Sequence, residues 1–145
     1  MSQPRVILCE RTGTWATAVR RYLRDDVAVS QVGSLAECRE QANGLPACLL
    51  VVELTAQNLA ELLGLIDEVA GGPPSARLLV LARDELIELA PLLREAGATH
   101  VFDSPRRLEG LRPIVMNHFR ATQSRQTDVF QRIWDTLPWN DALTA

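Results

Sequence analysis

Short apolar runs alternate with amphipathic stretches along most of this chain. Runs of four to seven residues rich in Val, Ile and Leu predict strands, because a strand covered on both faces carries apolar side chains on both. They predict five strands, near Arg5–Cys9, Val27–Val32, Cys48–Val52, Leu78–Ala82 and His100–Asp103. The amphipathic stretches between them predict helices. This alternation is typical of an α/β fold in which a parallel sheet has helices on both faces.

Capping patterns place the first two helices. Apolar residues at helical spacing between Trp15 and Leu23 predict the first. Thr12 or Thr14 is its candidate N-cap, since a hydroxyl oxygen can accept a hydrogen bond from a free amide of the first turn. The second opens at Ser34, which forms a capping-box pattern with the glutamate three residues later, and it ends at the following Asn-Gly pair.

Glycine and proline limit the next two helices. A third opens near Thr55 or Asn58 and stops at a Gly-Gly-Pro-Pro run. A fourth contains Pro91, and proline removes a backbone donor and clashes with the preceding turn. We therefore expect a turn near Glu85–Leu89, followed by a helix to about Ala96.

The last part of the chain differs from the rest in composition. A fifth helix is predicted over about residues 107–121, which completes a domain of residues 4–121. Residues 122–145 begin with a polar stretch and are predicted to form a C-terminal tail with a short amphipathic helix, capped by Thr127 or Asp128 and ended by a proline. The apolar stripe of this helix consists of Val129, Phe130, Ile133, Trp134 and Leu137.

Size and composition narrow the class of protein. A chain of 145 residues is long enough for one domain with a full core and too short for two of ordinary size. No apolar run reaches the roughly 18 residues of a membrane-spanning helix, and the N-terminal residues lack the pattern of a secretory signal. The sequence thus predicts a cytoplasmic protein without a membrane partner. The net charge of −3 argues against nucleic acid as a partner.

Cysteine and histidine residues give no sign of a metal site. Cys9, Cys38 and Cys48 lie within predicted regular elements and lack metal-ligand spacing, so we expect buried, reduced thiols. His100 and His118 are 18 residues apart, and neither has a second ligand near it in the sequence. We expect no metal and no cofactor.

The residues at the predicted strand ends carry a resemblance to a known family. Cys9-Glu10, Glu53, Ala82 and Ser104-Pro105 follow strands one, three, four and five, with 43, 29 and 22 residues separating Glu10, Glu53, Ala82 and Ser104. This order and spacing resemble the receiver domains of two-component response regulators. The Glu-Ala-Gly-Ala run at residues 95–98 also resembles the family. The resemblance implies a flavodoxin-like, five-stranded sheet of order 2-1-3-4-5, with the Ser104-Pro105 peptide in the cis form.

The five matching positions differ from the family pattern. Receivers carry an acid pair after strand one, a phosphoacceptor aspartate after strand three, a hydroxyl residue after strand four and a Lys-Pro pair after strand five. Here Cys9 replaces one acid, Glu53 the aspartate, Ala82 the hydroxyl and Ser104 the lysine. Phosphoryl transfer needs a well-placed nucleophile, a divalent cation and fixed positive charge. A thiol is a poor ligand for Mg²⁺, and Ala82 cannot bind a phosphoryl oxygen. We expect no phosphorylation and no enzymatic activity.

Two further positions bear on how a receiver would respond. The family's switch aromatic on strand five corresponds to Val101, with Phe102 on the opposite face of the strand. Glu53 could act as a permanent mimic of a phosphorylated aspartate, or it could be a solvated acid at a strand end. Because Ala82 and Ser104 lack the groups that respond, we favour the second interpretation.

The sequence favours a pseudo-receiver that acts as a protein–protein interaction module without phosphorylation. Its partner would be another signalling or regulatory protein, or a second copy of itself, bound through the tail or through the surface of helix four, strand five and helix five. The predicted partner-binding residues are Phe130, Ile133, Trp134 and Trp139, because large aromatic side chains are enriched in binding hot spots. Alternatively, these residues pack back on the domain. Two other functions stay open: an atypical but phosphorylatable receiver, and a small flavodoxin-like enzyme or ligand-binding domain.

Overall fold

A single parallel sheet forms the centre of the molecule. The computed structural model describes residues 5–138, apart from the side chain of Gln126. Its strands are β1 (Arg5–Cys9), β2 (Ala28–Val32), β3 (Cys48–Glu53), β4 (Ala76–Leu81) and β5 (His100–Phe102). Neighbouring strands are parallel and follow the order β2-β1-β3-β4-β5. The predicted fold class and strand order are confirmed.

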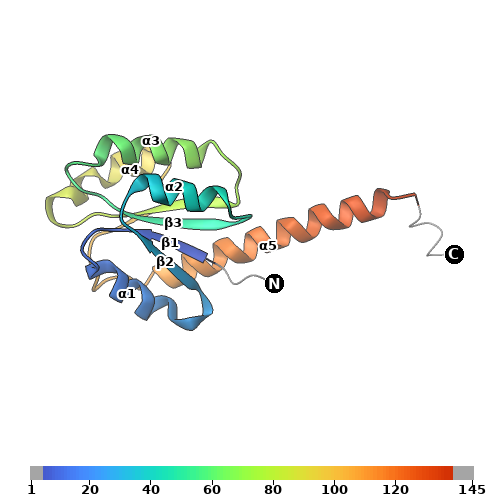
Figure 1. Cartoon of the computed structure of the whole chain (residues 1–145), viewed down its shortest axis with the longest axis horizontal. Helices are drawn as coiled ribbons and strands as arrows, with labels where there is room; N and C mark the ends of the chain where they lie inside the picture. The colour runs from blue at the N-terminus through green and yellow to red at the C-terminus, as the bar shows by residue number, and fades with distance from the viewer. Residues whose placement is uncertain (1–4, 139–145) are drawn as a thin grey trace.

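Helices cover both faces of this sheet. They are α1 (Thr14–Leu23), α2 (Leu35–Asn43), α3 (Leu59–Ala70), α4 (Ala90–Ala96) and α5 (Leu111–Thr136), with short 3₁₀ turns at Arg24–Asp26 and Asp84–Leu89. In Figure 1, α2, α3 and α4 lie on one side of the sheet, and α1 and α5 lie on the other. Within residues 5–138, no helix is both long enough and apolar enough to cross a lipid bilayer.

Alternate residues of each strand enter two separate cores. In β3, Leu50 and Val52 pack under α2, α3 and α4, whereas Leu49 and Val51 pack under α1 and α5. All four side chains are buried. The interior strands are apolar along nearly their whole length because helices cover both of their faces.

Local signals placed several helix ends correctly. The Oγ of Ser34 accepts a hydrogen bond from the backbone N of Glu37 at 3.2 Å, as the capping pattern predicts. Pro91 lies in the first turn of α4, where its missing N–H costs no helical hydrogen bond, and a 3₁₀ turn precedes it. Gly97 ends α4 at φ 127°, and a Cβ there would approach the Cβ of Ala70 to 2.6 Å. The glycine of the Glu-Ala-Gly-Ala run is thus required by close packing against α3.

The predicted cap of α1 is wrong. Neither Thr12 nor Thr14 caps the helix; the N-cap residue is Gly13, in the left-handed conformation at φ 82°. It makes no side-chain cap, so the free amides of the first turn need an acceptor from elsewhere. That acceptor belongs to the candidate site described below.

The prediction of a separate tail helix is also wrong in one respect. A helical tail is present, but it continues α5 without a break, so that α5 has 26 residues. Thr127 is not a cap, because its hydroxyl donates to the carbonyl oxygen of Gln123 one turn earlier at 3.0 Å. Asp128 lies within the same helix. The polar residues that suggested a boundary are compatible with a solvated helix surface, and α5 ends at Thr136, two residues before Pro138.

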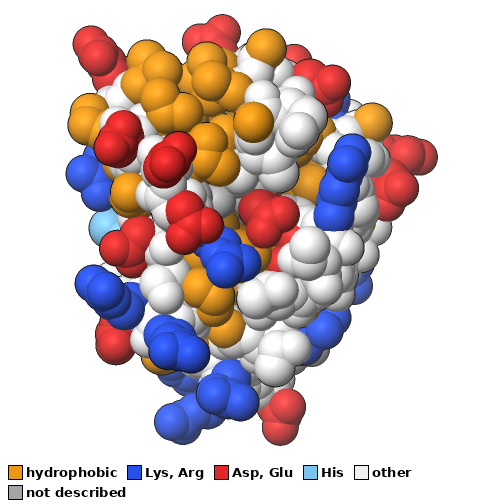
Figure 2. Space-filling view, turned by 90° about the vertical axis from the view of Figure 1, so that its left-hand side faces the viewer, with side chains coloured by type: hydrophobic (Ala, Val, Ile, Leu, Met, Phe, Trp, Pro, Cys, Tyr) orange, Lys and Arg blue, Asp and Glu red, His pale blue; other side chains and the backbone are white. Residues whose placement is uncertain are grey.

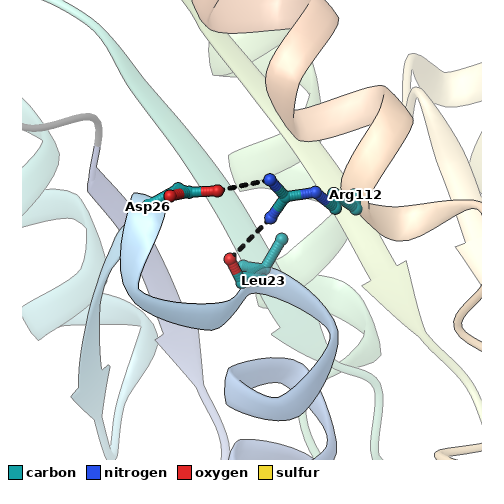
Figure 3. Close-up of polar contacts among 3 residues, drawn as sticks. All are labelled: Leu23, Asp26 and Arg112. Atoms are coloured by element: carbon teal, nitrogen blue, oxygen red, sulfur yellow. Dashed lines mark hydrogen bonds and ion pairs between the residues drawn. The ribbon is translucent and has the colours of Figure 1, made fainter.

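Two polar contacts orient α5 against the rest of the domain. At its start, Arg112 donates to the carbonyl oxygen of Leu23 at 2.8 Å and forms an ion pair with Asp26, which ties α5 to the end of α1 (Figure 3).

Further along α5, Nε2 of the buried His118 lies 2.9 Å from the carbonyl oxygen of Cys48 and 3.1 Å from that of Ser75. Since both partners are acceptors, Nε2 carries the proton. These contacts direct α5 beyond the edge of the sheet at which the strands begin (Figure 1).

Candidate functional site

The sequence singled out two regions, a degenerate phosphoacceptor site and a partner-binding tail, and they lie at opposite edges of the sheet. The five receiver positions lie where the strands end: Cys9 closes β1, Glu53 closes β3, and Ala82 and Ser104 follow β4 and β5. We call this the carboxyl edge. Figure 2 looks onto it and shows apolar side chains gathered toward the top of the view and most basic ones toward the bottom, with acidic side chains mainly across the top and middle. The distal part of α5, residues 125–136, projects past the opposite, amino edge (Figure 1).

Glu10 at the carboxyl edge caps α1. Its side chain is only 3% exposed, and its two carboxylate oxygens accept hydrogen bonds from the backbone N of Trp15 at 2.9 Å and of Ala16 at 2.6 Å. A carboxylate at this place satisfies free amides and interacts favourably with the helix dipole. Both oxygens are turned toward α1 and the side chain is almost fully buried, so Glu10 is poorly placed to ligate a cation. Sequence reasoning missed this role, because a glutamate four residues before the first helical residue is not a capping pattern.

The thiol of Cys9 is buried and protonated. Burial, followed by the negative charges of Glu37 and Glu53, raises the pKa of Cys9 to about 11. A thiol of this kind is neutral at physiological pH, and it is the thiolate that binds metals and attacks electrophiles. Cys9 therefore serves as a small apolar residue in the core beneath α2, as the sequence suggested.

Glu53 holds the phosphoacceptor position and is half-buried. Burial and the nearby charge of Glu10 raise the pKa of Glu53, while the indole of Trp15 and the guanidinium of Arg83 oppose that rise. The fully buried indole N–H of Trp15 has no hydrogen-bond partner within the described part of the chain. Glu53 is thus an acid held beside a second acid.

Ala82 has no hydroxyl and Ser104 has no ammonium, and these are the groups that receivers carry at the two positions. Ala82 is fully buried, and its backbone N donates to the carbonyl oxygen of Phe102 at 2.8 Å. The hydroxyl of Ser104 accepts from the backbone N of Arg106 at 3.2 Å, and its carbonyl accepts from Arg107 at 3.1 Å. Ser104 is therefore part of a turn. The expected cis Ser104-Pro105 peptide is wrong, because residues 5–138 contain no cis peptide bond.

The donor set at the carboxyl edge does not fit a divalent cation. The part of the chain that the structure describes contains no group of three or more His, Cys, Asp or Glu side chains placed to hold a metal ion. Glu10 is engaged with α1 and Cys9 is protonated, which leaves Glu53 as the one uncommitted acid among the family positions. Mg²⁺ requires a near-octahedral shell of oxygen ligands, so a single carboxylate is a weak site.

In receivers the fifth strand carries the switch aromatic. In β5 of this chain, the side chains of Val101 and Phe102 are both buried in the cores. Val101 packs beneath α3 and α4, and Phe102 packs on the α5 side of the sheet, as the alternation of a strand requires. Both are at most 5% exposed. His100 makes an edge-to-face contact with Phe102, with ring centroids 4.6 Å apart. The aromatic ring of β5 is thus already buried, on the face opposite to that of Val101.

The predicted partner-binding residues of the tail lie on an exposed apolar stripe. The exposed fractions are 53% for Val129, 68% for Phe130, 56% for Ile133 and 39% for Trp134. These side chains are not packed back onto the domain, so that alternative is wrong for the residues that the structure describes. Trp139 lies outside the described residues. We call Val129, Phe130, Ile133 and Trp134 the apolar stripe of α5.

An apolar groove runs between this stripe and the amino edge. It has a volume of about 440 Å³ and is lined by Pro46, Pro74, Ser75, Thr122, Arg125, Val129, Phe130 and Ile133. Arg125 bridges its two walls, because its guanidinium donates to the carbonyl oxygen of Pro74 at 3.3 Å. Four further hollows lie between α2 and α3, beside α4 and β5, between the end of α3 and the start of β4, and along α5, and the receiver positions line none of these four.

Comparison with solved structures shows which fold this is. A signal receiver domain of a protein described as a LuxO repressor, from Vibrio parahaemolyticus, matches with a TM-score of 0.67 and 16% identity, over 87% of this chain and 97% of that chain. A CheY-like protein, tadZ, from Pseudomonas aeruginosa PAO1 matches with a TM-score of 0.60 and 19% identity, over 79% of this chain and 94% of that chain. No family model and no curated protein matches the sequence. The chain has the receiver fold.

Proposed function

We propose that this chain is a pseudo-receiver, which acts in signalling or regulation as a protein–protein interaction module and does so without being phosphorylated. The observation that carries the proposal is the use of Glu10 as a helix cap, with both carboxylate oxygens committed to α1. The receiver fold supports a signalling role, as do the descriptions of its structural neighbours as a signal receiver and a CheY-like protein.

The chemistry at the carboxyl edge supports the loss of phosphorylation. A phosphoryl group on Glu53 would lie near the charge of Glu10, without the hydroxyl and ammonium groups that Ala82 and Ser104 replace. Phosphoryl transfer depends almost entirely on positioning and on positive charge around the moving group. Both are missing from the family positions of this chain.

The exposed apolar stripe of α5 supports an interaction role. Large apolar side chains clustered on one side of a projecting helix are costly to leave in water, and such patches mark interaction surfaces. We propose that Phe130, Ile133 and Trp134 anchor the partner, with Trp139 as a further contact. The carboxyl edge, by contrast, offers neither a groove of this kind nor a complete donor set.

Phosphorylation is tested directly by mass. The full chain is incubated with acetyl phosphate and Mg²⁺, and its intact mass is measured beside that of an active receiver treated in the same way. We expect the active receiver to gain a phosphoryl group and this chain to gain none. A phosphorylated fraction that disappears in Glu53→Gln would establish the rival function, an atypical phosphorylatable receiver.

Docking is tested on the immobilised full chain. Partner capture from the source cell is compared between the natural chain, a Phe130→Asp/Ile133→Asp variant and an Asp128→Asn control on the same helix. We expect a captured protein to be lost with the double variant and kept with the control. Capture that is equal for all three would exclude the stripe as the docking element.

A further inference from the structure

The apolar stripe of α5 is the continuation of a face that is otherwise buried. Val115, Phe119 and Thr122, three or four residues apart, are at most 9% exposed because they pack on the domain. Val129 and Ile133 continue the same face beyond the amino edge, since seven residues make two turns of a helix. There the domain no longer covers the helix, and both side chains are more than half exposed.

The shape of this surface suits a helix. The stripe lies on one side of α5 and spans about one and a half turns, and the loops at Pro46 and Pro74 form a second wall beside it. Helix-in-groove recognition uses such an arrangement, in which anchors at helical spacing from the bound helix enter an apolar groove. An extended strand would find no sheet edge here, because the groove runs between a helix and two loops.

Basic residues flank this groove. Arg125 and Arg132 are seven residues apart and lie on one flank of the stripe, and both are exposed. The ion pairs between described residues involve Arg39 and Arg112, which leaves the charge of Arg132 available to a partner.

A second copy of this chain would not complement that charge. At 100° per residue, Asp128 and Asp135 lie on the side of α5 opposite to the stripe, so two stripes facing each other bring no acid to Arg125 or Arg132. The exposed parts of the four stripe side chains amount to roughly 400 Å² per copy, against about 800 Å² per partner in a standard interface.

We infer that the groove and stripe bind an amphipathic helix of a partner protein that carries acidic residues beside its apolar face. The apolar contacts at Phe130 and Ile133 supply most of the affinity, and the acids of the partner pair with the arginine flank. This inference rests on the proposed function, because both place docking on distal α5. It adds the chemistry of the partner.

Two synthetic peptides of roughly 18 residues provide the probe, a length at which helix formation in water is practicable. Both carry leucine on one helical face and alanine elsewhere, with glutamate beside the leucine face in one and lysine in the other. Each is labelled with fluorescein and titrated with the full chain while anisotropy is followed. We expect the glutamate peptide to bind with a micromolar Kd, at least about tenfold more tightly than the lysine peptide, and to weaken as salt is raised.

Variants of the full chain assign the contacts. Arg132→Glu should weaken binding of the glutamate peptide by about tenfold and strengthen binding of the lysine peptide, because it reverses the charge of the flank. Phe130→Ala should weaken binding of the glutamate peptide by roughly thirtyfold, as expected for a hot-spot anchor. Arg20→Glu changes an exposed charge on α1 and should leave the preference intact. Circular dichroism of each variant checks that it is folded.

Several results would overturn the inference: binding of neither peptide, equal binding of both, or an unchanged preference in Arg132→Glu. So would a dimer of the free chain in sedimentation equilibrium that Phe130→Asp dissociates, because a second copy would then occupy the stripe. If peptide binding fails while partner capture still depends on Phe130 and Ile133, the inference alone is wrong. If capture does not depend on them, the proposed function is wrong as well.

Discussion

Glu10 accepts a hydrogen bond from the backbone N of Trp15 at 2.9 Å, and this contact makes a helix cap of the position at which receivers carry one acid of a pair. The neighbouring amide of Ala16 binds the other carboxylate oxygen. A buried acid is costly unless it is satisfied, and here two amides of α1 and the helix dipole satisfy it. The loss of phosphorylation that we propose would therefore be coupled to the stability of the fold.

Removing this cap should destabilise the protein. Glu10→Ala leaves two amides of α1 without their acceptors, and we expect a loss of about 1–3 kcal/mol in the free energy of unfolding. Glu10→Gln keeps one acceptor oxygen and should lose less. Urea unfolding followed by circular dichroism measures both, with the exposed Glu40→Ala as a matched control. Equal stability of Glu10→Ala and the natural chain would contradict the capping role.

Restoring the phosphoacceptor aspartate alone should not restore phosphorylation. Glu53→Asp supplies the family's nucleophile, but Glu10 stays bound to α1, Cys9 stays protonated, and neither Ala82 nor Ser104 gains a function. Intact mass after treatment with acetyl phosphate and Mg²⁺ should show no phosphorylated fraction. A phosphorylated Glu53→Asp chain would mean that the remaining residues still assemble a working site.

Stability should decrease in mild acid because of His118. Burial, helped by the positive charges of Arg77 and Arg125, lowers the pKa of His118, while the carbonyls of Cys48 and Ser75 oppose the shift. The unfolded chain therefore binds a proton at a higher pH than the folded one, and stability is lost as pH falls below the ordinary value of 6.5.

Urea unfolding measured between about pH 7 and pH 5 checks this expectation. The pKa of His100 is also lowered, by burial and by Arg94, and it contributes in the same direction. His118→Gln keeps a donor and does not titrate, so it should flatten part of the pH dependence, and His100→Gln serves as the comparison. An unchanged slope in His118→Gln would show that this buried histidine is not responsible.

The cysteine thiols should resist modification in the folded protein. Cys9, Cys38 and Cys48 are buried, and burial raises the pKa of Cys9 to about 11 and that of Cys38 to about 12. Reaction with a thiol reagent near neutral pH should thus be slow and should accelerate with the fraction unfolded in urea. Ser124→Cys places an exposed thiol on α5 as a positive control. Rapid labelling of the natural chain would contradict the burial of these thiols.

Features that depend on neighbouring residues could be predicted from the sequence. The cap at Ser34 and the interruption before Pro91 are decided within a few residues, so their patterns were sufficient. The cap of α1 was not predictable in this way. It depends on the left-handed turn at Gly13, which brings Glu10 back to the amides of Trp15 and Ala16, and no short motif describes that turn.

The sequence by itself determined the alternation of strands and helices and the loss of the receiver's functional groups. Both are written in side-chain types: apolar runs need burial on two faces, and Cys9, Ala82 and Ser104 lack the required chemistry whatever their positions. Only the tertiary structure decided how α5 runs and what its stripe faces. His118 contacts Cys48 and Ser75, which lie 70 and 43 residues away in sequence, and such distant contacts direct the helix past the sheet. Periodicity gives the spacing of a stripe, whereas its exposure depends on where the neighbouring elements end.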